Sequence, residues 1–308
     1  MYDLVYLPLV LPLLATVSAR RLAGLLEPRT ATWLLTGSAL VLAGASGAAL
    51  AVLAGTALGQ VPLLAWIGHW SADVVGRHDP VSMWLAVAAC MLLAAALTAA
   101  IRAAILRGRA LASAASVARR LPRSGRKLCV VDDTAPDAYA MPGLPGRIVV
   151  TAGMLDALDP LERRVLLAHE RAHLAGSHCL FVALTQLAAA ANPLLSPLAG
   201  AVRFSAERWA DEHAARVTGD RRLVARTIGK AALLTRARPE APSAALAMAA
   251  SLRGTGPVPR RVAALLAGPP QQHPLLLAIV LAVLALAVGC TIYAAHDLHE
   301  LIQLAGGT

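Results

Sequence analysis

Residues 159–176 read Asp-Pro-Leu-Glu-Arg-Arg-Val-Leu-Leu-Ala-His-Glu-Arg-Ala-His-Leu-Ala-Gly, and this stretch predicts one helix with both ends marked. Asp159 can cap the first turn, and Glu162 can complete a capping box three residues later. Pro160 suits the first helical position, and Gly176 suits the position just past the end. The sequence therefore predicts an ordered helical domain around this segment.

The same helix carries His169, Glu170 and His173, which form the pattern His-Glu-x-x-His. Because four residues make about one helical turn, both imidazoles project from one face and can hold one metal ion. Glu170 is rotated by about 100° from His169, so it lies beside the ion and can act as a general base on water. Apolar neighbours disfavour the alternative of two surface histidines. The pattern predicts one zinc ion per chain, with Glu170 as the catalytic residue.

A catalytic zinc takes three protein ligands and keeps one position for water. Glu207 is the preferred third ligand, and Asp211 follows it by four residues on the same face of a predicted helix. Asp211 would accept the free N–H of a ligating histidine and fix its tautomer. A solvated acidic face that includes Glu212 is the alternative. His178 falls one residue short of the spacing of a third histidine ligand, so we expect it to pack behind the ligands.

The composition places much of the remaining chain in a membrane. Of 308 residues, 57% are hydrophobic and 15% are charged, and the mean hydropathy is +0.62. A soluble chain carries about 25% charged residues, and a disordered chain would lack these apolar side chains. Apolar runs that can cross a bilayer occupy residues 4–19, part of 30–72, 82–101 and 274–295. The second run is long enough to add an interfacial segment with Trp66 and Trp70.

The basic residues set the expected orientation. The formal net charge is +10, and a run of arginines between residues 102 and 127 follows the third apolar run. Because short basic loops stay in the cytoplasm, residues 102–272 are expected inside and both termini outside. We interpret the basic residues as a signal for membrane topology and as contacts with anionic lipid, and we expect no direct binding of nucleic acid. Three parts are predicted: transmembrane helices 1–3 in residues 1–101, a cytoplasmic zinc domain in 102–272, and the last helix with a short extracellular tail in 273–308.

A further apolar run, residues 179–202, breaks at Asn192-Pro193. His173 and Glu207 must meet at one ion, so the chain between them begins and ends on one side of the membrane. A single crossing is therefore excluded. An apolar hairpin could dip into the bilayer or pack against the other helices.

Together these motifs resemble the BlaR/MecR-type membrane metallopeptidases, the sensor-proteases of antibiotic-resistance regulation. The resemblance covers roughly residues 80–295 and rests on four further segments: residues 146–151, residues 161–173, the turn 191–194, and residues 261–266 before the last apolar run. It implies a mainly α membrane protein with about four transmembrane helices and a cytoplasmic α+β gluzincin-type zinc protease domain inserted between helices 3 and 4. His169, His173 and Glu207 would be the ligands, and Glu170 the general base.

The end of the chain departs from this family, whose best-known members continue into an extracellular penicillin-binding sensor domain. Only residues 296–308 follow the last apolar run here. An activating signal is therefore expected to reach the protease domain through the transmembrane helices, through a partner or through residues 66–79. The HtpX and CAAX-prenyl-protease type is the second family considered, because it shares the zinc motif, a later glutamate and several spans.

The expected activity is zinc-dependent cleavage of cytoplasmic or membrane-proximal proteins. We expect residues 147–151 to hold an extended substrate by edge pairing. His213 and Tyr139 are candidates for the oxyanion partner. The resemblance implies regulated cleavage of a cytoplasmic winged-helix repressor, with self-cleavage expected in residues 235–260. Quality control of membrane proteins is the alternative.

A non-catalytic membrane transducer or a transporter is the rival class. Transporters tend to place charges inside their spans, and the predicted spans contain none. A degenerate protease would be expected to lose its general base, whereas Glu170 is present. These two features favour an enzyme.

Overall fold

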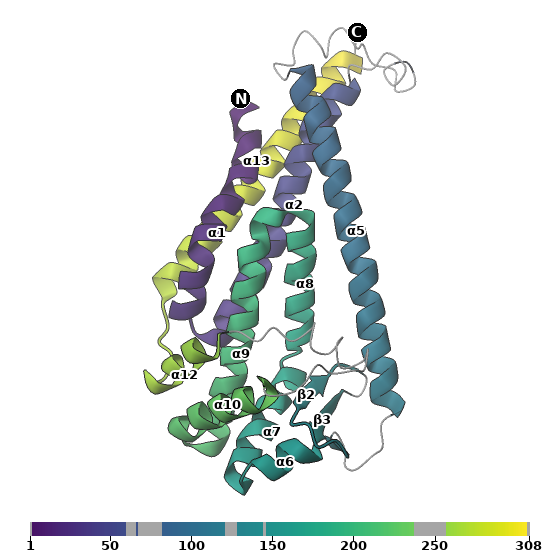
Figure 1. Ribbon diagram of the computed structural model, residues 1–308. Helices are drawn as coiled ribbons and strands as arrows, with labels where there is room; N and C mark the ends of the chain where they lie inside the picture. Colours follow the sequence, from purple (N-terminus) through teal and green to yellow (C-terminus); the bar gives the residue numbers. More distant parts are fainter. Residues whose placement is uncertain are drawn as a thin grey trace.

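The computed structural model describes residues 2–59, 66, 82–120, 128–143, 146–236 and 257–306. Most of this is helical, and Figure 1 shows long helices at one end and a smaller helical and stranded part at the other. The long helices are α1 (Leu7–Leu25), α2 (Pro28–Gly59), α5 (Met83–Arg120) and α13 (Pro274–Gly306), with a short 3-10 turn, η1 (Tyr2–Tyr6), before α1.

Four helical segments are long and apolar enough to cross a membrane: Leu4–Leu25, Pro28–Gly55, Met83–Arg120 and Pro274–Glu300. Apolar side chains such as Leu92, Ile101 and Ile279 are exposed on them, as expected for helices surrounded by lipid. The prediction of four apolar helices is therefore confirmed by length and composition. Trp66 is exposed, and the rest of the predicted interfacial segment, including Trp70, lies outside the described residues.

The third long helix extends further than the hydropathy indicates. α5 continues without a break through residues 102–120, where the sequence predicted the start of a basic loop. Alanine, leucine and arginine dominate this extension, and all three are strong helix formers, so the helix continues after its apolar part ends. No helix end marks residue 101 as a boundary.

A small sheet follows α5. It contains β1 (Leu128–Val131), β2 (Ala138–Met141) and β3 (Arg147–Thr151) in the order β1-β3-β2. β1 runs parallel to β3 and β2 runs antiparallel to it. Every residue of β3 is buried. The prediction that residues 147–151 receive a substrate by edge pairing is therefore wrong, because both edges of this central strand are already paired.

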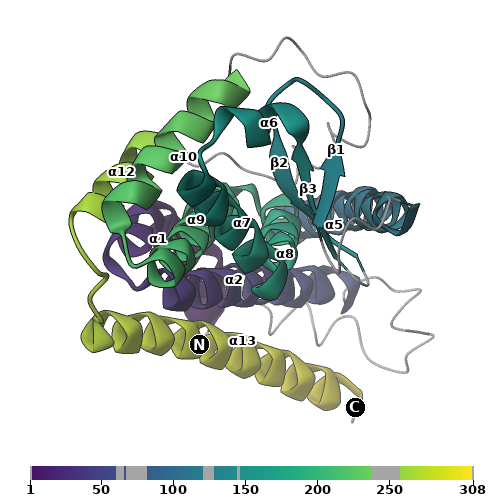
Figure 2. The same ribbon diagram turned by 90° about the horizontal axis from the view of Figure 1, so that it is seen from below.

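The predicted zinc helix is α7 (Pro160–Ala175), which follows the short helix α6 (Ala152–Ala157). Its capping box is present: the Asp159 carboxylate accepts the backbone N–H of Glu162 at 2.8 Å, and the Glu162 carboxylate accepts that of Asp159 at 3.1 Å. The helix ends at Gly176. α7 lies between the sheet and α9 (Figure 2).

The apolar run 179–202 forms a hairpin of α8 (His178–Ala191), a 3-10 turn η2 (Pro193–Leu195) and α9 (Ser196–Thr218). Its tip contacts two of the long helices. Thr16 donates its hydroxyl to the Leu194 carbonyl oxygen at 2.7 Å, and the Asn192 amide donates to the Ser46 hydroxyl at 3.3 Å. α7 and α8 meet at an angle of 55°. The run is thus a hairpin that packs among the long helices (Figure 1). By length and composition α7 and α8 together could also form a broken span or a re-entrant loop, so the exclusion of a crossing stays a prediction.

The remaining described helices are α10 (Arg221–Arg236) and α12 (Val258–Leu266). Arg221 pairs with both carboxylate oxygens of Glu212 and donates to the carbonyl oxygens of Leu265 and Gly268. These bonds fix α12 beside α9 and α10. Most of the expected self-cleavage segment, residues 237–256, lies outside the described residues.

Candidate metal centre

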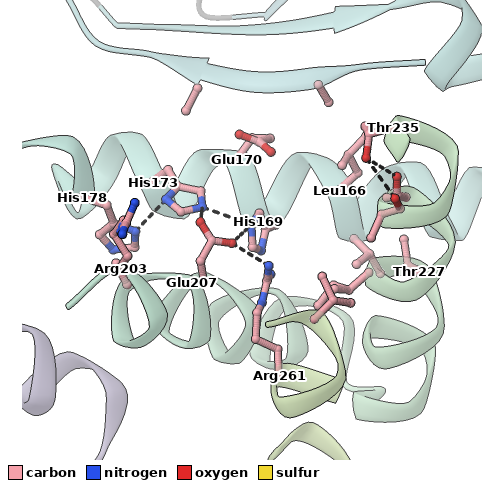
Figure 3. A pocket seen from close by; sticks show the side chains of 18 of the residues that line it. Leu166, His169, Glu170, His173, His178, Arg203, Glu207, Thr227, Thr235 and Arg261 are labelled. Atoms are coloured by element: carbon pink, nitrogen blue, oxygen red, sulfur yellow. Dashed lines mark hydrogen bonds and ion pairs between the residues drawn. The ribbon is translucent and has the colours of Figure 1, made fainter. Parts of the chain in front are cut away.

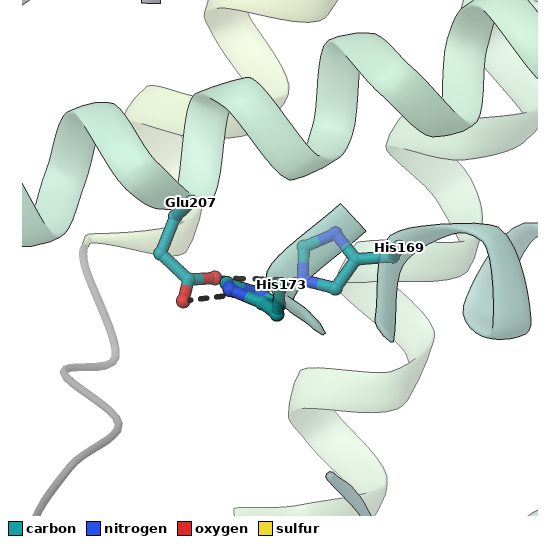
Figure 4. Close-up of side chains that lie close together, drawn as sticks. All are labelled: His169, His173 and Glu207. Carbon is teal, nitrogen blue, oxygen red and sulfur yellow. Dashed lines mark hydrogen bonds and ion pairs between the residues drawn. The ribbon is translucent and has the colours of Figure 1, made fainter. Parts of the chain in front are cut away.

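Two side chains of α7 and one of α9 converge at the centre of the smaller part (Figure 4). The Nε2 atoms of His169 and His173 lie 3.1 Å apart. Glu207 places Oε2 at 3.6 Å from Nε2 of His169 and Oε1 at 3.5 Å from Nε2 of His173. The structure therefore brings together the three residues that the sequence singled out, with their ligand atoms within 4.8 Å of one another.

The donor set fits a zinc ion. Two imidazole nitrogens and one carboxylate are a usual ligand set of a catalytic zinc, and a fourth position stays open for water. The His169 side chain is 11% exposed and that of Glu207 14%, so the donors are largely shielded from bulk water. An ionised carboxylate beside two imidazoles is well suited to bind a divalent cation in such a place.

Asp211 stands behind the first histidine. Its Oδ1 lies 3.0 Å from Nδ1 of His169, the ring nitrogen that faces away from Glu207, at an angle too bent for a regular hydrogen bond. The distance is the one that its predicted role requires. A carboxylate in this place selects the His169 tautomer whose Nε2 faces the metal.

Arg261 of α12 is the site residue that the sequence analysis did not assign. Its Nη1 lies 2.7 Å from Oε2 of Glu207, while its Nε and Nη2 donate to the two oxygens of Asp211 at 2.8 and 2.6 Å. Arg261 is only 6% exposed. Arg260 and Arg261 precede the last apolar run, so they indicated membrane topology. A second signal was the pair Glu207 and Asp211, two carboxylates one helical turn apart, which need a cationic partner if they are buried.

Burial and neighbouring charges act in opposite directions on the ionisation of these groups. Burial raises the pKa of both Glu207 and Asp211, but the positive charge of Arg261 and the contacts with His169 together outweigh it and hold both pKa values below their usual range. Burial holds the pKa of His173 well below its usual value. Burial also opposes protonation of His169, yet its contacts with Asp211 and Glu207 prevail and raise its pKa to about 10. In the metal-free protein, a zinc ion therefore has to displace a proton from His169.

A cavity of about 1200 Å³ opens onto this centre. It is lined by the three converging side chains, Glu170, Arg203 and Arg261 among others. Figure 3 shows Glu170 between α7 and the strand above it, on the side of α7 that faces the cavity. Neither Tyr139 nor His213 is among the described residues that line it. The structure therefore gives no support to the two predicted oxyanion partners.

His178 lies next to the centre without joining the three donors. Its Nδ1 is 2.8 Å from Nδ1 of His173, on the far side of that ring from Glu207. The expectation that it packs behind the ligands agrees with this position.

The sequence of residues 106–196 matches the family model of Peptidase family M48. No curated protein and no solved structure matches the chain. The matched segment contains the whole of α7, with Glu170 and both histidines, and ends before Glu207. The match covers less than half of the chain and is a similarity to metallopeptidases of this family.

Proposed function

We propose that this chain is a membrane-anchored, zinc-dependent endopeptidase. His169, His173 and Glu207 hold the zinc ion, and Glu170 is the general base. The observation that carries the proposal is the convergence of these ligand atoms from two helices in a cavity that Glu170 also lines. A zinc ion bound there supplies the Lewis acid of peptide-bond hydrolysis.

Glu170 handles the protons. Its carboxylate accepts one from the attacking water and passes it to the nitrogen of the leaving amine. Arg261 holds Oε2 of Glu207 at 2.7 Å, which fixes the carboxylate while Oε1 faces His173. A non-catalytic transducer, the rival class, would not need the buried carboxylate of Glu170 at this position.

The edge strand β2 is suited to hold an extended peptide. Thr151 donates its N–H to the Asp137 carbonyl oxygen at 2.9 Å, and the antiparallel register pairs Tyr139 with Val149. Backbone groups alternate in such a ladder, so the N–H and C=O of Ala140 point away from β3. Ala140 also lines the cavity. A substrate strand can therefore pair with β2, opposite Glu170, with little demand on its sequence.

The basic residues that follow the third apolar run support a cytoplasmic site, and the α8–α9 hairpin supports a site close to the membrane. Substrates are therefore cytoplasmic or membrane-proximal proteins. Cleavage of a winged-helix repressor rests on the BlaR/MecR-type resemblance alone. The M48 match favours a second candidate, processing or quality control of membrane proteins, because HtpX-like peptidases belong to M48 as well.

The catalytic proposal is tested on the purified full chain, with zinc measured by elemental analysis and cleavage measured on an unfolded model protein. Glu170→Gln should keep about one zinc per chain and lose activity by about 10²–10⁴-fold. Glu207→Gln should lose zinc, whereas Asp156→Asn, a control at an exposed carboxylate of α6, should keep both zinc and activity. Activity of Glu170→Gln within about tenfold of the wild type would overturn the assignment.

The substrate is addressed by N-terminal proteomics of cells that express the wild type or Glu170→Gln. A single repressor stabilised by the inactive variant supports regulatory cleavage. Broad stabilisation of membrane-protein fragments, without a repressor among them, supports quality control.

A further inference from the structure

We infer that His178 is a positioning residue for the metal centre: its Nδ1 accepts the Nδ1–H of His173 and so directs Nε2 of His173 toward the metal. The inference rests on the proposed function, since it takes His173 as a ligand. Gly176 is part of the same arrangement, because a residue without a side chain leaves the space that the His178 ring fills.

The direction of the hydrogen bond follows from the two ring nitrogens of His173. Nε2 faces His169 and Glu207, at 3.1 and 3.5 Å. A neutral imidazole that binds a metal through Nε2 carries its hydrogen on Nδ1. The Nδ1 atoms of His173 and His178 are 2.8 Å apart, so one donates and the other accepts. His173 is then the donor, and the neutral His178 ring carries its own hydrogen on Nε2, which is buried without a hydrogen-bond partner among the described residues.

The His178 ring is held by packing on two sides. It is 2% exposed, stands edge-on to the His173 ring at 4.7 Å, and lies 4.6 Å from the Trp209 ring, measured between centroids. Trp209 follows Glu207 by two residues on α9 (Ser196–Thr218). The same helix therefore supplies one ligand and the surface that holds the partner of another.

The chain between α7 and α8 is built to admit this ring. A Cβ atom on Gly176 would lie 2.4 Å from Nε2 of His178, which is closer than any real contact. The backbone of Gly176 has φ −84°, which any residue adopts, so the close ring is the reason for a glycine here. Ser177 has the left-handed φ of 50°, and α8 begins directly after it with His178. Such a conformation costs of order 1–3 kcal/mol in a residue other than glycine, and strain of this kind clusters at functional sites.

The two histidine ligands are thus supported differently. His169 has the Asp211 carboxylate behind it at 3.0 Å, and His173 has the His178 ring behind it at 2.8 Å. A neutral partner behind His173 orients the ring without adding another buried anion to Glu170, Glu207 and Asp211. Arg261 already balances those two carboxylates.

The test measures zinc affinity of the full chain by competition with a chelator, together with the melting temperature of the metal-free protein. His178→Phe keeps an aromatic ring against Trp209 but cannot accept the hydrogen bond, and it should weaken zinc binding by about 10–100-fold. His178→Gln offers a side-chain carbonyl oxygen as acceptor and should restore most of that affinity. Gly176→Ala should weaken zinc binding as well, by displacing the His178 ring.

The possible results separate this inference from the proposed function. Wild-type zinc affinity in His178→Phe would overturn the positioning role, and so would a loss in His178→Gln as large as in His178→Phe. If His178→Phe does not fold, wild-type zinc affinity in Gly176→Ala, or a loss of about tenfold or more in His178→Gln, would overturn the positioning role. His173→Ala tests the proposed function itself: full zinc affinity in that variant would remove His173 as a ligand, whatever His178 does.

Discussion

Replacing Arg261 by methionine should be the most damaging single change around the centre in the metal-free protein. The guanidinium is 6% exposed and lies 2.6–2.8 Å from oxygens of both Glu207 and Asp211. Removing one partner of a buried pair leaves an uncompensated charge and costs about 3–5 kcal/mol. One guanidinium serves both carboxylates, so the two contacts do not add as independent terms. At roughly 2–4 °C per kcal/mol, the melting temperature should fall by on the order of 10 °C.

The neighbouring Arg260 provides a matched control. Its guanidinium is exposed and stacks 4.6 Å from the Phe204 ring, a contact of about 0.5–1 kcal/mol, so Arg260→Met should lower the melting temperature by only about 2 °C. The measurement is thermal denaturation in detergent with a chelator present. Equal shifts in the two variants would refute the ion-pair argument, since any effect would then come from α12 as a whole.

The pH dependence gives a second, independent check of the same argument. Folded-state pKa values of Glu207 and Asp211 are below their usual 4.5 and 3.8, so their stabilising effect is present above those values and lost as the pH falls through the folded pKa values. In Arg261→Met the folded-state pKa values of Glu207 and Asp211 rise, so this variant loses less stability than the wild type as the pH falls. The melting temperatures of the wild type and Arg261→Met should therefore converge below about pH 4. A constant difference down to pH 3 would contradict the assignment.

Three further predictions follow from other parts of the molecule. Reporter fusions after Arg126, which lies outside the described residues, should report the cytoplasm, and fusions after Thr308 the outside; an outside signal at Arg126 would reverse the orientation. Asn192→Ala removes the bonds to Ser46 and to the Leu194 N–H, and the first alone should cost about 0.6 kcal/mol, measured by thermal denaturation; no change would show that the Asn192 side chain does not stabilise the hairpin tip. In the metal-free protein the pKa of His169 is about 10, so its protonated form stabilises the folded state below pH 6.5. This stabilisation is lost as the pH rises toward 10. Zinc affinity in a chelator competition should rise over the same interval, because fewer protons compete; a flat profile would exclude a protonated His169.

Local signals were sufficient for the parts of the site that lie within one helix. The cap residues around Asp159 and the four-residue spacing of His169 and His173 are properties of a short segment, so α7 could be predicted almost to the residue. Glu207 and Asp211 were identifiable for the same reason, as carboxylates one turn apart on α9. The ligand geometry at 3.1–3.6 Å, in contrast, depends on how α7 packs against α9.

The parts that could not be predicted depend on long-range pairing. The sequence Arg-Ile-Val-Val-Thr at 147–151 indicates a buried strand, but its place between β1 and β2 is set by strands before it in the chain. Arg261 is separated from Asp211 by fifty residues, and a cation before an apolar helix reads equally well as a topology signal. Hydropathy marks where the apolar part of α5 ends, whereas the helix continues through the helix-forming residues that follow, as far as Arg120.

The contacts of α9 show why the membrane helices and the candidate metal centre cannot be treated as separate units. Arg208, next to Glu207, is 6% exposed and donates to the carbonyl oxygens of Ala23 and Gly24 at 2.6 and 3.2 Å, at the end of α1. The last carbonyls of a helix lack partners within it, so this guanidinium satisfies them and complements the helix dipole. Removing α1 would leave the buried Arg208 cation, next to the proposed ligand Glu207, without these acceptors. The helix that carries Glu207 is therefore held in register from the membrane side, and the geometry of the centre depends on helices that contribute no ligand to it.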